Sequence, residues 1–270
     1  MAPAFVPEGA HAQGESFEVW SGRVGDRPCV RKRARSAATT PALEREALCL
    51  ERLERSGFDA CPRLVTFDRS ANTPELVETY VLGEPLARLF DVLGTPLPGR
   101  LGVHLAWRIV ARFAELHALV EEGERIDLVH GDPSPAQLVV TPGNDVAIVD
   151  FGASGLRAQD GTALRATGRG TVPWAAPELV RAETVPTQAT DRYAAAAIAA
   201  YALVGDALVP SVVGGALVLR IGTGGLLAHA TSALPSPVAE HFRAHLALDP
   251  TERPGDLLAL RDALDILRRA

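Results

Sequence analysis

Two aspartates on either side of a predicted strand hairpin are the residues best placed to do chemistry. Asp132 lies in the segment His-Gly-Asp-Pro-Ser-Pro-Ala-Gln (residues 130–137), and Asp150 opens an Asp-Phe-Gly run. Between them the sequence predicts short strands at 137–140 and 146–149, joined by a Pro-Gly-Asn-Asp turn. This arrangement brings both carboxylates to one end of the hairpin, where they could hold a hydroxyl nucleophile beside a metal-bound phosphate. The alternative is a hairpin with two solvated turn aspartates.

Three later segments follow this pair in a defined order. Residues 170–178 read Gly-Thr-Val-Pro-Trp-Ala-Ala-Pro-Glu, Asp191 opens an apolar helix, and residues 248–254 end in Arg-Pro. Together with the aspartate segments they resemble the catalytic loop, the Asp-Phe-Gly motif, the Ala-Pro-Glu segment and the late arginine of protein kinases. The resemblance extends from about residue 19 to residue 254 and is to the bacterial serine/threonine type. It implies that Asp191 ties its helix to the catalytic loop.

The resemblance also implies roles for single residues. Asp132 would orient or deprotonate the acceptor hydroxyl, and Asp150 would bind the Mg²⁺ that bridges the phosphates of ATP. Gln137 stands where the family has asparagine, the other metal ligand, and its amide oxygen reaches one methylene further. Arg253 and Glu178 would form a buried ion pair that is structural. The implied cofactors are ATP and Mg²⁺.

Lys32 is the single lysine among 27 basic residues. It resembles the family's phosphate-binding lysine, and Glu46 resembles its helix partner. A shift of one residue would place Arg31 there instead, on the other face of the strand. Because a planar guanidinium does not replace a compact ammonium between phosphates and a carboxylate, the arginine excess favours Lys32. The alternative is a surface lysine in the basic run 31–35.

The rest of the implied nucleotide site departs from the family in places. Aligning Val19 with the family's valine leaves Gly14 as the single glycine of the phosphate loop, and Ser134 replaces a lysine. Glu78 precedes the linker beside the expected adenine, although a strand residue that faces solvent is the alternative. The implied nucleotide-binding residues are Gly14, Val19, Val30, Lys32, Glu78, Tyr80, Val81 and Val139.

The elements that must position these residues predict an α+β chain. A helix from Thr40 to Gly57 lies among strands expected at 17–20, 28–32, 63–67 and 74–81. Residues 83–85 (Gly-Glu-Pro) mark a boundary, after which helices dominate, among them 101–120. We therefore expect one two-lobed protein-kinase-like domain over residues 1–270. Its small antiparallel β lobe with one helix would span about 8–82, and its larger, mainly α-helical lobe about 86–270.

Composition excludes several other classes. A net charge of −6 argues against nucleic-acid binding, and three cysteines are too few for a disulfide scaffold. The most apolar stretch, residues 193–204, is too short to span a membrane, and the N-terminus does not resemble a signal peptide. We therefore expect a cytoplasmic protein that does not act at membranes.

The sequence thus predicts a serine/threonine protein kinase, which transfers phosphoryl groups from ATP to a protein substrate. Two alternatives stay open. A catalytically weak or inactive pseudokinase, acting as a nucleotide-binding or scaffold module, is favoured by the altered glycine loop, Ser134 and Gln137. A small-molecule kinase of the aminoglycoside type is suggested by the His-Gly-Asp start at residue 130. The Ala-Pro-Glu segment argues against the latter. The oligomeric state is not predicted.

Overall fold

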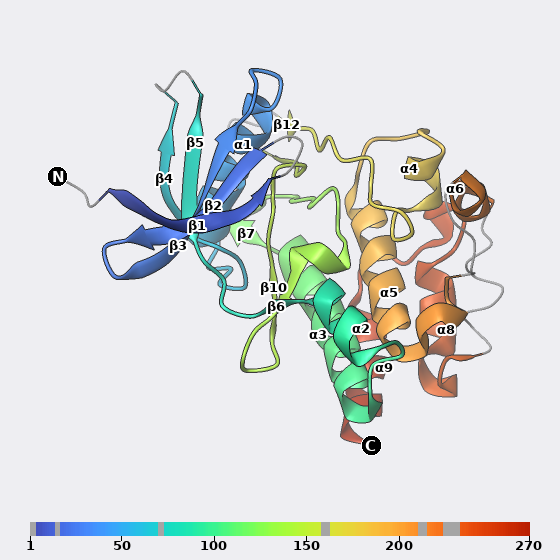
Figure 1. The fold of residues 1–270 in the computed structure, drawn as a ribbon. Helices are drawn as coiled ribbons and strands as arrows, with labels where there is room; N and C mark the ends of the chain where they lie inside the picture. Colours follow the sequence, from blue (N-terminus) through green and yellow to red (C-terminus); the bar gives the residue numbers. More distant parts are fainter. Residues whose placement is uncertain (1–3, 14–16, 70–72, 158–162, 210–214, 224–232) are drawn as a thin grey trace.

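The structure, a computed structural model, describes residues 4–13, 17–69, 73–157, 163–209, 215–223 and 233–270. It is α+β (Figure 1): a five-stranded antiparallel sheet and one helix come first, and helices dominate the rest. We call residues 4–82 the sheet region and residues 83–270 the helical region. Among the described helices, none combines the length and the apolar character needed to cross a membrane.

The sheet has the strand order β1-β2-β3-β5-β4. Its strands are β1 (Phe5–Gln13), β2 (Phe17–Val24), β3 (Arg27–Ala34), β4 (Leu64–Asp68) and β5 (Glu75–Thr79). The turn between β2 and β3 contains Gly25 with a φ of +59°, a left-handed conformation that suits glycine. The sheet starts with β1, which lies before the first strand expected from the sequence.

The sheet register determines which side chains share a face. Val19 of β2 pairs with Lys32 of β3, which pairs in turn with Leu76 of β5. Leu76 packs on α1 (Thr40–Arg55), so the Lys32 face is the one that α1 covers. Arg31 lies on the opposite face, with its guanidinium carbon 4.5 Å from the centre of the Trp20 ring. The one-residue shift that would have placed Arg31 in the site is therefore wrong.

Helix α1 follows the apolar pattern of its sequence. Leu43, Ala47, Leu50 and Leu53 are all buried, and proline occupies the first turn, where its missing N–H costs nothing. Glu46 is also buried, with 1% of its surface exposed, although it is charged. A charged side chain buried on the inner face of a helix needs a partner, and that partner lies in the sheet.

The helical region contains the remaining elements. Its helices are α2 (Leu86–Leu93), α3 (Gly99–His117), α4 (Pro177–Val180), α5 (Gln188–Val204), α6 (Gly215–Gly222), α8 (Ser236–His245) and α9 (Leu258–Arg269). Its strands are β6 (Glu84–Pro85), β7 (Val120–Glu121), β8 (Glu124–Arg125), β9 (Leu138–Val140), β10 (Val146–Ile148), β11 (Leu156–Arg157) and β12 (Ala163–Leu164). β9 and β10 form the predicted hairpin, and β6 joins it as a third strand.

Two buried carboxylates hold the helical region together. Glu178 accepts two hydrogen bonds of 2.7 Å from the guanidinium of Arg253, and both side chains are buried. Asp191, at the start of α5, accepts hydrogen bonds from the backbone N–H groups of His130 and Gly131 at 2.6 and 3.0 Å. Both contacts predicted from the sequence are confirmed.

Candidate functional site

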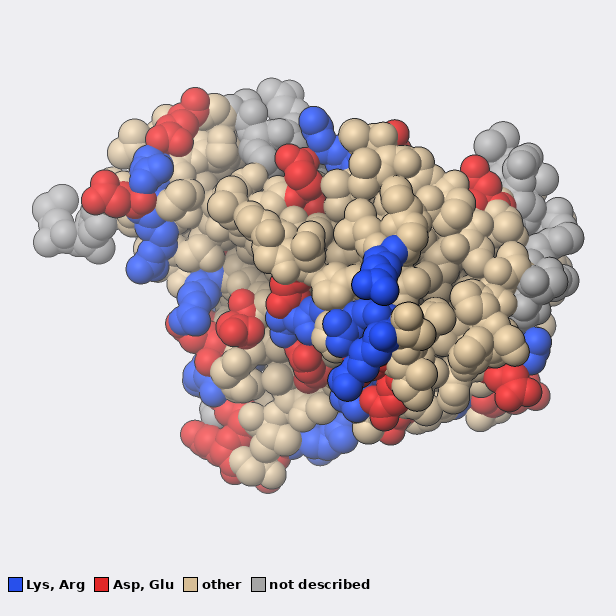
Figure 2. Space-filling view, turned by 90° about the horizontal axis from the view of Figure 1, so that it is seen from below, with Lys and Arg blue, Asp and Glu red and all other residues tan. Residues whose placement is uncertain are grey.

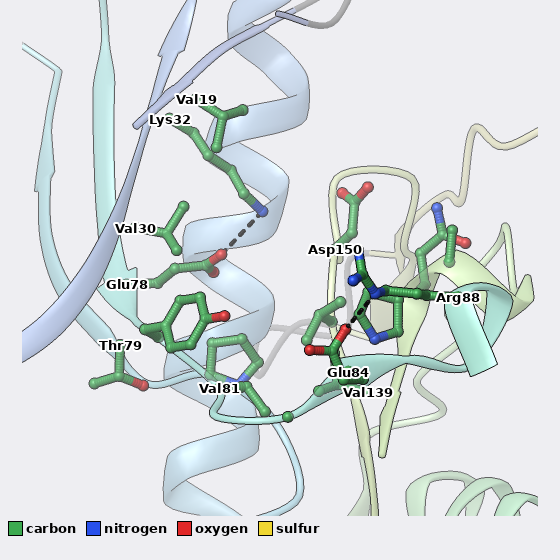
Figure 3. Close-up of a pocket in the computed structure, with 17 residues that line it drawn as sticks. Val19, Val30, Lys32, Glu78, Thr79, Val81, Glu84, Arg88, Val139 and Asp150 are labelled. Carbon is green, nitrogen blue, oxygen red and sulfur yellow. Dashed lines mark ion pairs between the residues drawn. The ribbon is translucent and has the colours of Figure 1, made fainter. Parts of the chain in front are cut away.

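A cavity of about 450 Å³ lies between the sheet region and the helical region. This is the size of a pocket for a small organic ligand. Nine of the residues proposed from the sequence for the nucleotide and the metal line it: Val19, Val30, Lys32, Glu78, Tyr80, Val81, Gln137, Val139 and Asp150. Figure 3 draws the residues that line this cavity. Gly14 lies outside the described residues.

The walls of the cavity differ in character. Val19 and Val30 come from neighbouring strands of the sheet, and Val139 comes from β9 in the helical region (Figure 3). These branched side chains can sandwich a flat apolar group between the two regions. The segment from Thr79 to Val81 lines one side, and its backbone groups could bond the edge of such a group.

Lys32 is held by two carboxylates. Its Nζ lies 2.6 Å from Glu46 Oε1 and 3.0 Å from Glu78 Oε1, and only 12% of the side chain is exposed (Figure 3 draws the Glu78 contact). Glu46 Oε1 also accepts a hydrogen bond of 3.2 Å from the backbone N–H of Phe151. α1, β3 and β5 therefore meet at one ammonium group, and the loop after β10 is bonded to it through Glu46.

Glu78 is buried, with 4% of its surface exposed. The alternative that it is a solvent-facing strand residue is therefore wrong. Its Oε1 atom bonds to Lys32, whereas its buried Oε2 atom has no hydrogen-bond partner in the described part of the chain. Sequence reasoning had placed Glu78 beside the ligand but had not found its bond to Lys32. That bond depends on the β3–β5 register, in which Glu78 pairs with Val30 and is a diagonal neighbour of Lys32.

The electrostatics of this cluster are unbalanced. Burial raises the pKa of Glu46 to about 8 and also raises the pKa of Glu78, with Lys32 opposing both shifts. Burial lowers the pKa of Lys32, but Glu46, Glu78 and Asp150 outweigh it and hold that pKa well above its ordinary value. One ammonium faces two buried carboxylates, so the protonation of each acid depends on the other.

Asp150 and Gln137 supply oxygen atoms on the other side of the cavity. Asp150 has a φ of +67°, a left-handed conformation that is uncommon for a residue other than glycine. Gln137 ends a short 3₁₀ turn (Pro135–Gln137), and its Oε1 accepts a hydrogen bond from the Ser134 hydroxyl. A carboxylate and an amide oxygen suit Mg²⁺, which typically takes one or two carboxylates together with substrate phosphates. The described part of the chain has no cluster of three or more His, Cys, Asp or Glu residues for a metal.

Asp132 lies beyond the cavity lining on the loop that Asp191 anchors. Its Oδ1 accepts a hydrogen bond of 2.8 Å from the hydroxyl of Thr171. Gly131 beside it has a φ of +91°, and a Cβ there would come within 2.5 Å of the carbonyl oxygen of Ala153. A residue larger than glycine would not fit at position 131. The backbone path that leads into Asp132 therefore depends on this glycine.

Two further charged residues at the mouth of the cavity were not predicted. Glu84 and Arg88 form an exposed ion pair of 3.2 Å, and both side chains line the cavity (Figure 3). Their spacing of four residues is a signal for such a pair, but not for its position at a cavity. Elsewhere the surface carries mixed charge: on the face in Figure 2, basic side chains lie close to acidic ones, apart from one short basic stripe.

No protein-family model matches this chain, and no curated protein has significant sequence similarity to it.

Proposed function

We propose that this chain is a two-lobed protein-kinase-like domain that transfers a phosphoryl group from ATP to a serine or threonine hydroxyl of a protein. The sheet region would be the small lobe and the helical region the large one. The observation that carries the proposal is the 2.6 Å contact between Lys32 and Glu46, at a cavity that Asp150 and Gln137 also line. A buried ammonium opposite oxygen ligands for a metal is the arrangement that phosphoryl transfer requires.

Each residue of the site has a part in this reaction. The Lys32 ammonium binds phosphate oxygens, and Glu46 keeps that ammonium directed into the cavity. Asp132 accepts the proton of the acceptor hydroxyl at a carboxylate oxygen, in the position that the Thr171 hydroxyl now occupies. Mg²⁺ bound by Asp150 and Gln137 would neutralise charge on the phosphates. Val19, Val30 and Val139 would enclose the base. Positioning and charge stabilisation supply most of the rate enhancement.

The test is a transfer assay with purified protein, labelled ATP and Mg²⁺. We expect label on the chain itself or on a generic protein substrate, and a loss of at least 100-fold in Asp132→Asn, as for other positioned general bases. Glu75→Gln serves as the control, because Glu75 pairs with Arg31 and Arg33 on the outer face of the sheet. If no protein is labelled, or if Asp132→Asn is as active as the wild type, the transfer proposal is wrong.

A nucleotide-binding domain without transfer activity is the second candidate. It is favoured by Gln137, whose amide oxygen is engaged by Ser134, and by Lys32, which two carboxylates share. A thermal-shift titration separates the two candidates, because a ligand that binds only the folded state raises the melting temperature. A shift with MgATP in the absence of any transfer would favour this candidate. The small-molecule kinase has less support, since the Glu178–Arg253 pair belongs to the protein-kinase resemblance.

A further inference from the structure

The bond between Lys32 and Glu78 has no part in the mechanism above. Phosphate binding by Lys32 requires one carboxylate to hold the ammonium, and Glu46 already does so from α1. Glu78 approaches from β5 and lines the cavity itself, whereas Glu46 lies behind the lining. A phosphate that enters the cavity therefore meets Glu78 next to the ammonium that it must reach.

The two contacts of Lys32 are not equivalent. Glu46 is the closer partner, at 2.6 Å against 3.0 Å, and its Oε1 accepts a second hydrogen bond from the N–H of Phe151. Among the residues that the structure describes, Glu78 has no such second donor, and its buried Oε2 has no hydrogen-bond partner. If one contact breaks when an anion binds, it is the contact with Glu78, because Glu46 is held on two sides.

The charged groups around Lys32 also indicate that an anion must compete for its ammonium. The charged groups that face it are Glu46 from α1, Glu78 from β5 and Asp150 from the loop after β10. Among the described residues, Lys32 is the single cation that pairs with either buried glutamate. An anionic ligand therefore has to share this one ammonium with the carboxylates that already contact it.

We propose that Glu78 is a positioning residue that competes with the phosphates of ATP for Lys32 and so weakens nucleotide binding. The inference rests on the proposed function. When phosphate oxygens bind Lys32, Glu78 gives up the one hydrogen-bond donor that it has among the described residues and stays buried as a charged acceptor. Losing a hydrogen bond to a buried charged group costs enough to change affinity by about 10-fold to 100-fold. Removing the charge of Glu78 removes this cost.

The test compares MgATP affinities by calorimetry at pH 7.5. Glu78→Gln keeps the size of the side chain, and Glu78→Leu removes its polar atoms, so two independent variants lack the charge. Glu75→Gln is the matched control on the same strand, because it makes the same change on the outer face of the sheet. We expect both Glu78 variants to bind MgATP at least tenfold more tightly than the wild type, with Glu75→Gln unchanged.

A second readout follows Lys32 directly. Because Lys32 is the only lysine, protein labelled with ¹³C and ¹⁵N in lysine has one lysine side-chain NMR signal. In the absence of ligand, the chemical shift of this signal should differ from the wild type in Glu78→Gln and match the wild type in Glu75→Gln. In the wild type it should also move when MgATP binds, because the ammonium exchanges a carboxylate for phosphate.

The outcomes separate the two proposals. If the Glu78 variants are folded and bind MgATP no more tightly than the wild type, the competition is wrong and the proposed function stands. If neither the wild type nor any variant binds MgATP at millimolar concentration, the proposed function and the competition fail together. A lysine signal that does not move between wild type and Glu78→Gln overturns the competition even where MgATP binds.

Discussion

Two buried ionic sites in this molecule are built in opposite ways. In the helical region, Arg253 and Glu178 form a balanced pair with two parallel hydrogen bonds. The guanidinium also donates from Nε to the carbonyl of Ala247 and lies 4.8 Å from the centre of the Tyr193 ring. In the sheet region, Lys32 is shared between Glu46 and Glu78, and one oxygen of Glu78 has no partner within the described ranges.

The difference separates a structural ion pair from a binding site. The charges of Arg253 and Glu178 cancel, and both carboxylate oxygens are bonded, so nothing is left for a ligand to satisfy. The cluster around Lys32 has two carboxylates for one ammonium, and one oxygen of Glu78 at the cavity wall has no hydrogen-bond donor among the described residues. Groups of this kind are costly for stability and are kept mainly where function needs them.

The largest effect is expected from breaking the balanced pair. Arg253→Ala leaves the carboxylate of Glu178 buried without a cation, which should cost about 3–5 kcal/mol of unfolding free energy. Urea unfolding followed by circular dichroism measures this loss. Arg63→Ala is the control, because Arg63 forms an exposed pair with Glu54 and should change little. Equal losses in the two variants would show that the buried pair is no more structural than a surface pair.

Much of this comparison could be predicted from the sequence. Arg253 and Glu178 lie 75 residues apart, yet their pairing followed from the resemblance, and so did the bond between Asp191 and the loop at His130. The helix around Glu46 followed from its apolar period and its proline. These features depend on motifs or on local patterns, which a single sequence carries.

The remaining features depend on tertiary contacts. Strand β1 has few branched apolar residues, so its pairing with β2 decides its conformation more than its own propensity does. The bond between Glu78 and Lys32 follows from the register of β3 against β5, and that register is set by the packing of Leu76 on α1. The ion pair of Glu84 and Arg88 could be predicted from its spacing, but its place at the cavity follows from the β6–β9 pairing.

An intermediate effect is expected from the pH dependence of the unbalanced cluster. Burial raises the pKa of Glu46 from 4.5 to about 8, so the folded protein binds a proton that the unfolded chain has lost. The resulting stability is fully present below pH 4.5 and disappears as the pH rises through 8. The melting temperature of the wild type should therefore fall by several degrees between pH 6 and pH 8.5.

Glu46→Gln tests the origin of this pH dependence, because it removes the titrating group and should flatten the profile. Glu75→Gln, on the outer face of the sheet, should keep the slope of the wild type. Differential scanning calorimetry across this pH range gives all three profiles. A melting temperature that rises with pH in the wild type and falls in Glu46→Gln would show that protonation of Glu46 does not stabilise the folded protein.

The smallest effect on stability is expected at the cavity mouth, where a glutamate and an arginine form an ion pair in solvent. Glu84 and Arg88 are 58% and 70% exposed, so water screens their attraction and either side chain can be solvated alone. Glu84→Gln should therefore change the unfolding free energy by less than about 0.5 kcal/mol, well below the loss expected for Arg253→Ala. Urea unfolding of the wild type and of Glu84→Gln measures this change. In high salt the difference in unfolding free energy between the two proteins should vanish. A loss of several kcal/mol would mean that burial does not separate structural from incidental ion pairs in this molecule.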